Sequence, residues 1–300
     1  MDERGQSRYF SALREKGRAK VSWLEGHGLN INSEPWEFVE SLLRTDLTGG
    51  DKQRTLFDDW TSWTNAKAIL GNVGRGGVYQ SFSPFSVDEI KMFVGLYCMN
   101  GLNISPRLDY KFQPQESDWI NGNDVVSNAF GAGAVQRHKQ FKYLFAVQDP
   151  MVAIPDKKKS PNHKVNHMFA HMLKAFSASY DVGRNISGDE QDCPFQGKHE
   201  DKQRVNYKKA GDGFMIDLIC EDGFTINFYP RNAPPPKKWT DKGFSPTHAR
   251  FLLMFDSLEG EYFRCYMDNL FISAKFYWFD GKQNKRTTVF ISKQSDAQRL

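Results

Sequence analysis

The stretch GFMIDLICEDGFTINFYP, residues 213–230, decides the fold. It contains two runs rich in β-branched and aromatic residues, 213–220 and 224–230, which are joined by Glu221-Asp222-Gly223. An Asp-Gly pair between two such runs is a strong signal for a tight hairpin turn. The stretch therefore predicts two antiparallel strands in the C-terminal half of the chain.

The segments around this hairpin predict the rest of a sheet. Residues 186–195 read as a strand before it, and FSPTHARFLLMFDSL (244–258) reads as a helix with Ser245 as N-cap and Pro246 in its first turn. A fourth strand is expected over 262–271, then a short aromatic helix and a fifth strand over 287–292. Three strands followed by helix, strand, helix, strand predict an α/β fold with a ribonuclease-H-like mixed sheet.

The sequence before residue 186 predicts an all-α domain. Leu56, Phe57, Trp60 and Trp63 recur at helical spacing, and Ser86-x-x-Glu89 is a capping box at the start of an apolar run. We therefore expect three parts. Residues 1–50 form a polar, basic and poorly ordered arm with a short helix near 36–43, residues 51–185 form the helical domain, and residues 186–300 form the sheet domain.

A row of histidines marks the last helix before the sheet. His163, His167 and His171 repeat every four residues, a spacing that can bind a metal. No acid or cysteine on the same face completes a ligand set, and the row lies opposite the apolar stripe of the helix. We expect the row to face solvent, where it is available to DNA phosphate.

The composition indicates a protein with a real core and a mild positive charge. Of 300 residues 39% are hydrophobic, the formal net charge is +4, and no apolar run is long enough to span a membrane. The four cysteines lie far apart, which argues against a cysteine-based zinc module. Basic residues recur in clusters, and the candidates for DNA contact are Lys198, Lys202, Arg204, Lys208, Lys209, Lys237 and Lys238.

Three acids stand within four residues in SGDEQDCPFQGK (187–198). Because successive side chains of a strand point to opposite faces, Asp189 is separated from Glu190 and Asp192. We expect Glu190 and Asp192 to make local hydrogen bonds or salt bridges, for which Lys198 and Lys202 are candidate partners. Asp189 could meet Asp268, at the end of the fourth strand, and a divalent cation would relieve the repulsion between the two carboxylates. The alternative is that Asp189 caps a turn and Asp268 bonds at a strand end.

Several segments resemble piggyBac-type transposases. The run Ser187-Gly-Asp-Glu-Gln, with the later Pro194-Phe-Gln-Gly-Lys198, resembles the family's "DEQ…PF-G-R/K" segment. Residues 267–273 resemble its "DNFFTS" segment, residues 85–102 resemble its "DEI…F-G-L…G" helix, and residues 180–191 resemble the run that leads to "DEQ". The four matches occur in the family's order, across residues 55 to 293.

The resemblance implies a DDE/D-type transposase that cuts and joins DNA with Mg²⁺ or Mn²⁺. Asp189 and Asp268 would be the first two catalytic acids and would ligate the metal. The partner would be double-stranded DNA, the region before Ser187 would serve DNA binding and dimerisation as a homodimer, and the location would be nuclear.

Departures from the family pattern predict a catalytically incomplete site, with weak or absent strand cleavage. Only Asp280 and Asp296 follow Asp268 as aspartates, both too early for the family's third acid, so the sheet domain is expected to be truncated. Asp192 replaces an apolar residue, and the cysteine-rich module is missing. Three readings stay open: a metal-dependent transposase whose third acid comes from elsewhere, a DNA-binding protein with an inactive nuclease fold, and a protein-interaction scaffold.

Overall fold

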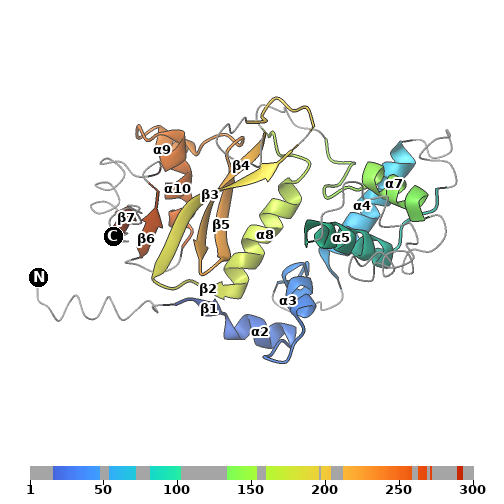
Figure 1. The fold of residues 1–300 in the computed structure, drawn as a ribbon, viewed down its shortest axis with the longest axis horizontal. Coiled ribbons are helices and arrows are strands. Elements are labelled where there is room, and N and C mark those ends of the chain that lie inside the picture. Colours follow the sequence, from blue (N-terminus) through green and yellow to red (C-terminus); the bar gives the residue numbers. More distant parts are fainter. Residues whose placement is uncertain are drawn as a thin grey trace, which may run out of the picture.

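A computed structural model describes residues 16–47, 54–71, 82–102, 134–153, 160–195, 197–203, 212–258, 263–268, 271 and 289–292 (Figure 1). The helices are α2 (Val21–His27), α3 (Pro35–Leu42), α4 (Leu56–Leu70), α5 (Val87–Leu102), α7 (Ala134–Leu144), α8 (Asn166–Ser179), α9 (Lys237–Thr240) and α10 (Pro246–Asp256). The strands are β1 (Arg18–Ala19), β2 (Tyr180–Asp181), β3 (Asn185–Pro194), β4 (Gly213–Glu221), β5 (Phe224–Pro230), β6 (Arg264–Met267) and β7 (Val289–Ser292).

Five strands form a mixed sheet in the order β5-β4-β3-β6-β7. The neighbours β5, β4 and β3 run antiparallel to one another, while β6 is parallel to β3 and β7 is parallel to β6. The predicted hairpin is confirmed, with Asp222 in a left-handed conformation at φ 47°. The predicted Ser245 cap is confirmed as well, since its hydroxyl accepts from the His248 N–H at 3.3 Å.

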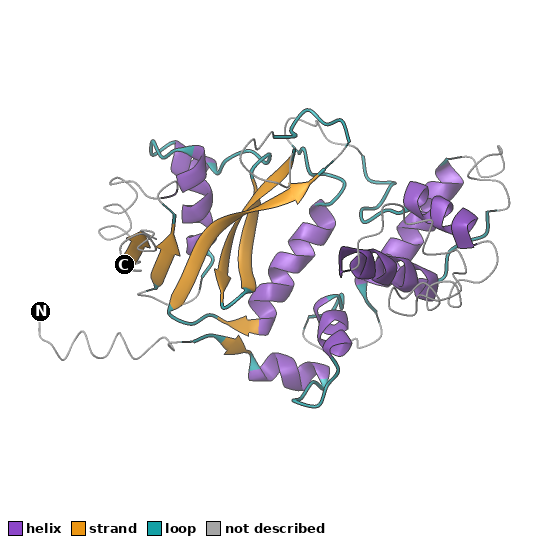
Figure 2. Cartoon of the chain, viewed as in Figure 1, coloured by secondary structure: helices purple, strands orange, loops and turns teal. Residues whose placement is uncertain are grey.

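Helices cover both faces of this sheet (Figure 2). One face of the sheet packs on α10, where Ile219, Phe251 and Met267 are almost fully buried in one hydrophobic cluster. The other face packs on α8 mainly over β5, through ring contacts of Phe169 and Phe176 with Phe228. The α8 face of β3 is thus left partly uncovered.

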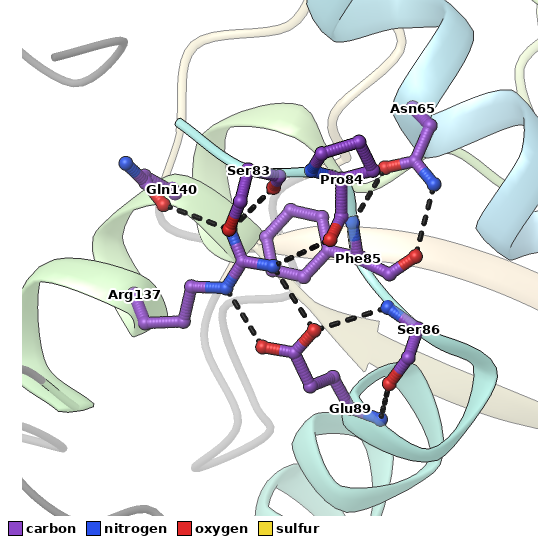
Figure 3. Close-up of polar contacts among 8 residues, drawn as sticks. All are labelled: Asn65, Ser83, Pro84, Phe85, Ser86, Glu89, Arg137 and Gln140. Carbon is purple, nitrogen blue, oxygen red and sulfur yellow. Dashed lines mark hydrogen bonds and ion pairs between the residues drawn. The ribbon is translucent and has the colours of Figure 1, made fainter. Parts of the chain in front are cut away.

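Helices α4, α5 and α7 form a second group with its own core, drawn apart from the sheet in Figure 1. A polar cluster around Arg137 of α7 joins them (Figure 3). Its guanidinium donates to Glu89 through Nε at 2.8 Å and to the Ser83 carbonyl through Nη1 at 2.7 Å, and it lies 3.7 Å from the centre of the Phe85 ring. Asn65 of α4 bonds the Phe85 backbone in both directions, so one arginine and one asparagine tie three helices to the segment before α5.

The capping box predicted at the start of α5 is confirmed, and it is part of this cluster. The Glu89 N–H donates to Ser86 Oγ at 3.1 Å, and the Ser86 N–H donates to Glu89 Oε2 at 3.0 Å. Burial alone would raise the pKa of Glu89, but the Arg137 and Ser86 hydrogen bonds and the Arg137 charge together lower it.

Residues 16–47 are ordered against the rest of the chain, which differs from the expected loose arm. Strand β1 pairs antiparallel with β2, and helices α2 and α3 pack on α8. The buried Glu221 carboxylate accepts from the Gly17 N–H and from the Gly183 N–H, each at 2.7 Å. A Cβ on Gly17 would collide with Glu221 and Tyr180. The segment has little hydrophobic core of its own, because it packs on α8 and hydrogen-bonds to Glu221.

The expected solvent-facing histidine row is wrong. His171 donates through Nε2 to the Leu42 carbonyl at 2.9 Å, and the His167 ring lies edge-on to Trp63 with centroids 4.7 Å apart. Burial lowers the pKa of His171. The face opposite the apolar stripe is therefore covered by α4 at His167 and by the end of α3 at His171.

Some expectations fall outside the described residues. They concern the short aromatic helix between the fourth and fifth strands, and Asp280 and Asp296. Of the helices that the structure describes, none has the length and hydrophobicity to cross a membrane.

The Glu221 contact gives a stability prediction. In Glu221→Gln one of the two backbone N–H donors loses its acceptor, so we expect the free energy of unfolding to fall by about 1–3 kcal/mol. Urea denaturation measures the loss, and limited proteolysis should show faster cleavage near residue 16. Asp222→Asn is the matched control, because Asp222 is exposed in the adjacent turn. Equal behaviour of the two variants would contradict the role given to Glu221.

The Glu89 contact predicts a pH dependence. Because the folded-state pKa of Glu89 is lowered, its stabilisation is present above the unfolded value of about 4.3 and is lost as the pH falls through the folded value. Glu89→Gln should therefore be less stable than the wild type at pH 7, and the difference should shrink on acidification. The midpoints of urea unfolding of the wild type and the variant, measured at pH 7 and at an acidic pH, test this. Asp88→Asn changes an exposed neighbouring residue, and its stability difference from the wild type should not shrink on acidification.

Candidate functional site

Strands β3 and β6 place Asp189 and Asp268 side by side. Gly188 and Met267 are the last register partners of this parallel pair, and Asp189 and Asp268 directly follow them. Neighbouring strands lie about 4.8 Å apart. Both aspartates are exposed, whereas Gly188 and Met267 are buried against α10, so both lie on the uncovered side of the sheet.

We call this side the open face and define it by its exposed residues Ser187, Asp189, Gln191, Tyr266 and Asp268. Asp189 Oδ1 accepts the Glu190 N–H at 2.8 Å. Carboxylate oxygens on an exposed surface are hard ligands suited to Mg²⁺ or Mn²⁺, so the donor set fits such an ion. Across the described ranges, however, no group of three His, Cys, Asp or Glu side chains gathers as a metal cage.

Glu190 points to the α10 side of the sheet, as strand alternation predicted. It lies 3.7 Å from Arg231 Nη2. Arg231 also donates through Nε to Asp217 Oδ1 at 2.6 Å, and Arg250 Nη1 lies 3.5 Å from the other oxygen of that carboxylate. We call these four residues the Arg231 network.

Asp217 is the buried centre of this network. Its side chain is 0% exposed. Burial raises the pKa of Asp217, and the charges and hydrogen bonds of Arg231 and Arg250 oppose that rise. Burial also lowers the pKa of Arg250. A buried charge needs such partners, so the network holds β3, β4 and α10 in one arrangement behind the open face.

The basic candidates for DNA contact are spread over the molecule. Lys202 is paired with Asp212 at 3.3 Å, and Lys238 is paired with Asp256 at 2.5 Å while lying over the Trp239 ring. Lys237 and Lys238 belong to α9, which packs on α10, on the far side of the sheet from Asp189. The last three candidates, Arg204, Lys208 and Lys209, lie outside the described residues. Lys198 alone of the described candidates lines a hollow on the open-face side of the sheet.

That hollow, which we call the β3 groove, has a volume of about 820 Å³. It is lined by the segment 161–169 around the start of α8, by residues 193–201 at the end of β3, and by the adjacent ends of β4 and β5. Cys193 and its register partner Phe214 are on the same side of the sheet as Asp189 and line the groove. The groove therefore continues the open face along β3.

A comparison with protein families matches residues 53–287 to the family described as transposase IS4. The match covers most of the chain. This chain belongs to the transposase IS4 family.

One solved structure similar to this transposase-family chain is described as the cryo-EM structure of a piggyBac transposase synaptic complex with hairpin DNA. The TM-score is 0.63 at 17% identity, over 87% of the present chain. The chain spans about half, 51%, of the length of the piggyBac chain that it matches. A comparison with curated proteins finds no match.

The sequence reasoning missed the Arg231 network and the aromatic residues of the groove. The sequence did contain a signal for the Arg231 network, which is the acid Asp217 inside the apolar run GFMIDLIC. A charged side chain that is buried among apolar residues needs a cationic partner. No comparable signal pointed to Phe214 and Phe195, because the groove brings together segments that are far apart in this transposase-family sequence.

The Arg231 network predicts a large loss of stability. Asp217→Asn removes the charge that compensates two buried guanidiniums, so we expect the free energy of unfolding to fall by about 3–5 kcal/mol. Asp256→Asn, which breaks the exposed pair with Lys238, should cost no more than about 1 kcal/mol. Urea denaturation of both variants compares them, and equal losses would show that the buried network does not hold the sheet.

Proposed function

We propose that this chain binds double-stranded DNA and that Asp189 and Asp268 together bind Mg²⁺ or Mn²⁺. The observation that supports this most directly is the placement of both carboxylates directly after the last register pair of two parallel strands, on the exposed part of the face that α8 covers over β5. Membership of the transposase IS4 family supports the same proposal. So does the DNA named in the description of the similar piggyBac complex.

We infer further that the sheet is a ribonuclease-H-like core. Three antiparallel strands followed by two parallel ones, with α10 between the third and fourth, is the order expected for that fold. The helical group α4, α5 and α7 would then serve DNA binding or assembly as a homodimer. A nuclear location is part of the same proposal, because double-stranded DNA would be the partner.

The chemistry of the site follows from its oxygen donors. A divalent cation held there would polarise a phosphodiester oxygen and lower the pKa of a bound water. Asp189 and Asp268 would hold the ion from neighbouring strands, and the backbone N–H of Glu190 orients one oxygen of Asp189. The Arg231 network keeps β3 fixed from behind, so the two carboxylates stay in register.

A second candidate function is DNA binding without strand cleavage. It is favoured by one observation, which is that the described residues bring only two carboxylates together at the site. Loss of one ligand from such a site removes compensation for charge that develops in the transition state and costs orders of magnitude in rate.

Mn²⁺ binding and duplex-DNA binding by the full chain test the proposal. We expect Asp189→Asn and Asp268→Asn each to weaken Mn²⁺ binding at least about tenfold, since each removes one of two charged ligands. Duplex affinity should fall with salt at a slope near −0.9 per neutralised phosphate. Asp241→Asn, an exposed acid beyond α9, is the control and should bind Mn²⁺ like the wild type.

The outcomes separate the readings. Mg²⁺-dependent nicking that Asp189→Asn abolishes would establish cleavage. Metal and duplex binding without nicking would establish the second candidate. Unchanged Mn²⁺ binding in both Asn variants would refute the metal site, and no duplex binding at low salt would refute the DNA role.

A further inference from the structure

The β3 groove has a built aromatic wall. The Phe195 ring lies 5.3 Å from the Phe214 ring, and the His199 ring stands edge-on to Phe214 at 5.1 Å. Phe195 folds back over Gly197, where a Cβ would collide with the ring. Phe195 as a whole residue is nevertheless 38% exposed. The wall is thus held in place before any ligand arrives, and it keeps an accessible aromatic face.

Polar groups surround this wall. The side-chain amides of Asn162 and Asn232 bond to each other in both directions, at 3.0 and 2.9 Å, and both line the groove. Lys164 and Lys198 also line it and are exposed. These side chains supply cations for a phosphate, together with donors and acceptors for a base edge.

The charged residues of the groove are mixed. Its described lining contains Lys164 and Lys198 together with Glu200 and Asp201, and the two exposed lysines are the groups that could contact a phosphate. The backbone N–H of Asp201 donates to His199 Nδ1 at 3.2 Å, which holds the His199 ring in place beside Phe214. An acidic peptide would also be attracted, but it would make little use of exposed aromatic rings beside amides.

We propose that the β3 groove binds an unpaired segment of DNA, with a base stacked on Phe195. Bases of an intact duplex are stacked inside the helix, so an aromatic wall can serve only a nucleotide that has left its partner, whereas lysines beside aromatic rings are the usual combination for single strands. The groove begins at Cys193, four residues along β3 from Asp189 or roughly 13 Å, so the stacked nucleotide lies within a few nucleotides of the aspartate pair. This inference rests on the proposed DNA function and adds the kind of DNA.

The test uses the full chain with two probes, a mixed-sequence single-stranded oligonucleotide that carries 2-aminopurine and its fully paired duplex. We expect the single strand to bind with a change in 2-aminopurine fluorescence. Phe195→Ala should weaken its affinity by between about fivefold and a hundredfold, because one stacking contact is lost, and should leave duplex affinity within about twofold. Phe195→Tyr should restore single-strand binding, because it keeps the ring.

Lysine variants give a matched pair. Lys198→Ala should weaken single-strand binding, while Lys237→Ala, on the far side of the sheet, should not. Equal effects of Phe195→Ala on single strand and duplex, or a wild-type chain that binds duplex but gives no 2-aminopurine response, would overturn the groove assignment and leave the proposed function standing. A wild-type chain that binds neither probe would overturn both.

Discussion

Strand β3 hydrogen-bonds to an antiparallel strand on one side and to a parallel strand on the other, and the arrangement of the site follows from that pairing. The antiparallel side fixes β4 and β5 as a local hairpin. The parallel side requires the chain to cross the sheet through α10 before β6 can pair. Because that pairing ends at Gly188 and Met267, the next residue of each strand is an aspartate on the same uncovered side.

The two faces of the sheet differ in burial and therefore in role. On the α10 side, apolar side chains and the Arg231 network are buried together, so the strands can neither slide nor twist freely. On the α8 side, the helix packs mainly on β5, and Ser187, Asp189 and Gln191 of β3 are exposed. Alternation along one strand therefore divides the acidic stretch into Asp189, which is open to a ligand, and Glu190, which helps to hold the strand.

Local sequence patterns predicted the helix caps and the hairpin turn, but they could not predict contacts between residues that are far apart in the sequence. The hairpin at Asp222, the box of Ser86 and Glu89 and the cap at Ser245 are decided by residues within four positions of one another, so their sequence signals suffice. Glu221 and Gly17 are 204 positions apart in the sequence. Arg231, which contacts Glu190, comes directly after β5 and is likewise distant from β3 in sequence. The histidine row was misjudged for the same reason, since periodicity shows that α8 has two faces but cannot show that both are covered. For the site, alternation and the resemblance together pointed to Asp189 and Asp268, and the structure places them side by side.

The Gly17–Glu221 contact has a consequence for how the chain can be divided. The first described residues lie against the far end of β4, while helices α4, α5 and α7, which follow them in sequence, have a separate core. The helical group is in this sense an insertion between two parts of one body, α2–α3 and α8 onward. A shortened chain that starts at residue 51 would leave the Glu221 carboxylate facing water and strip one side of α8. Any attempt to isolate the sheet should therefore keep Gly17 and the helices α2 and α3 that pack on α8.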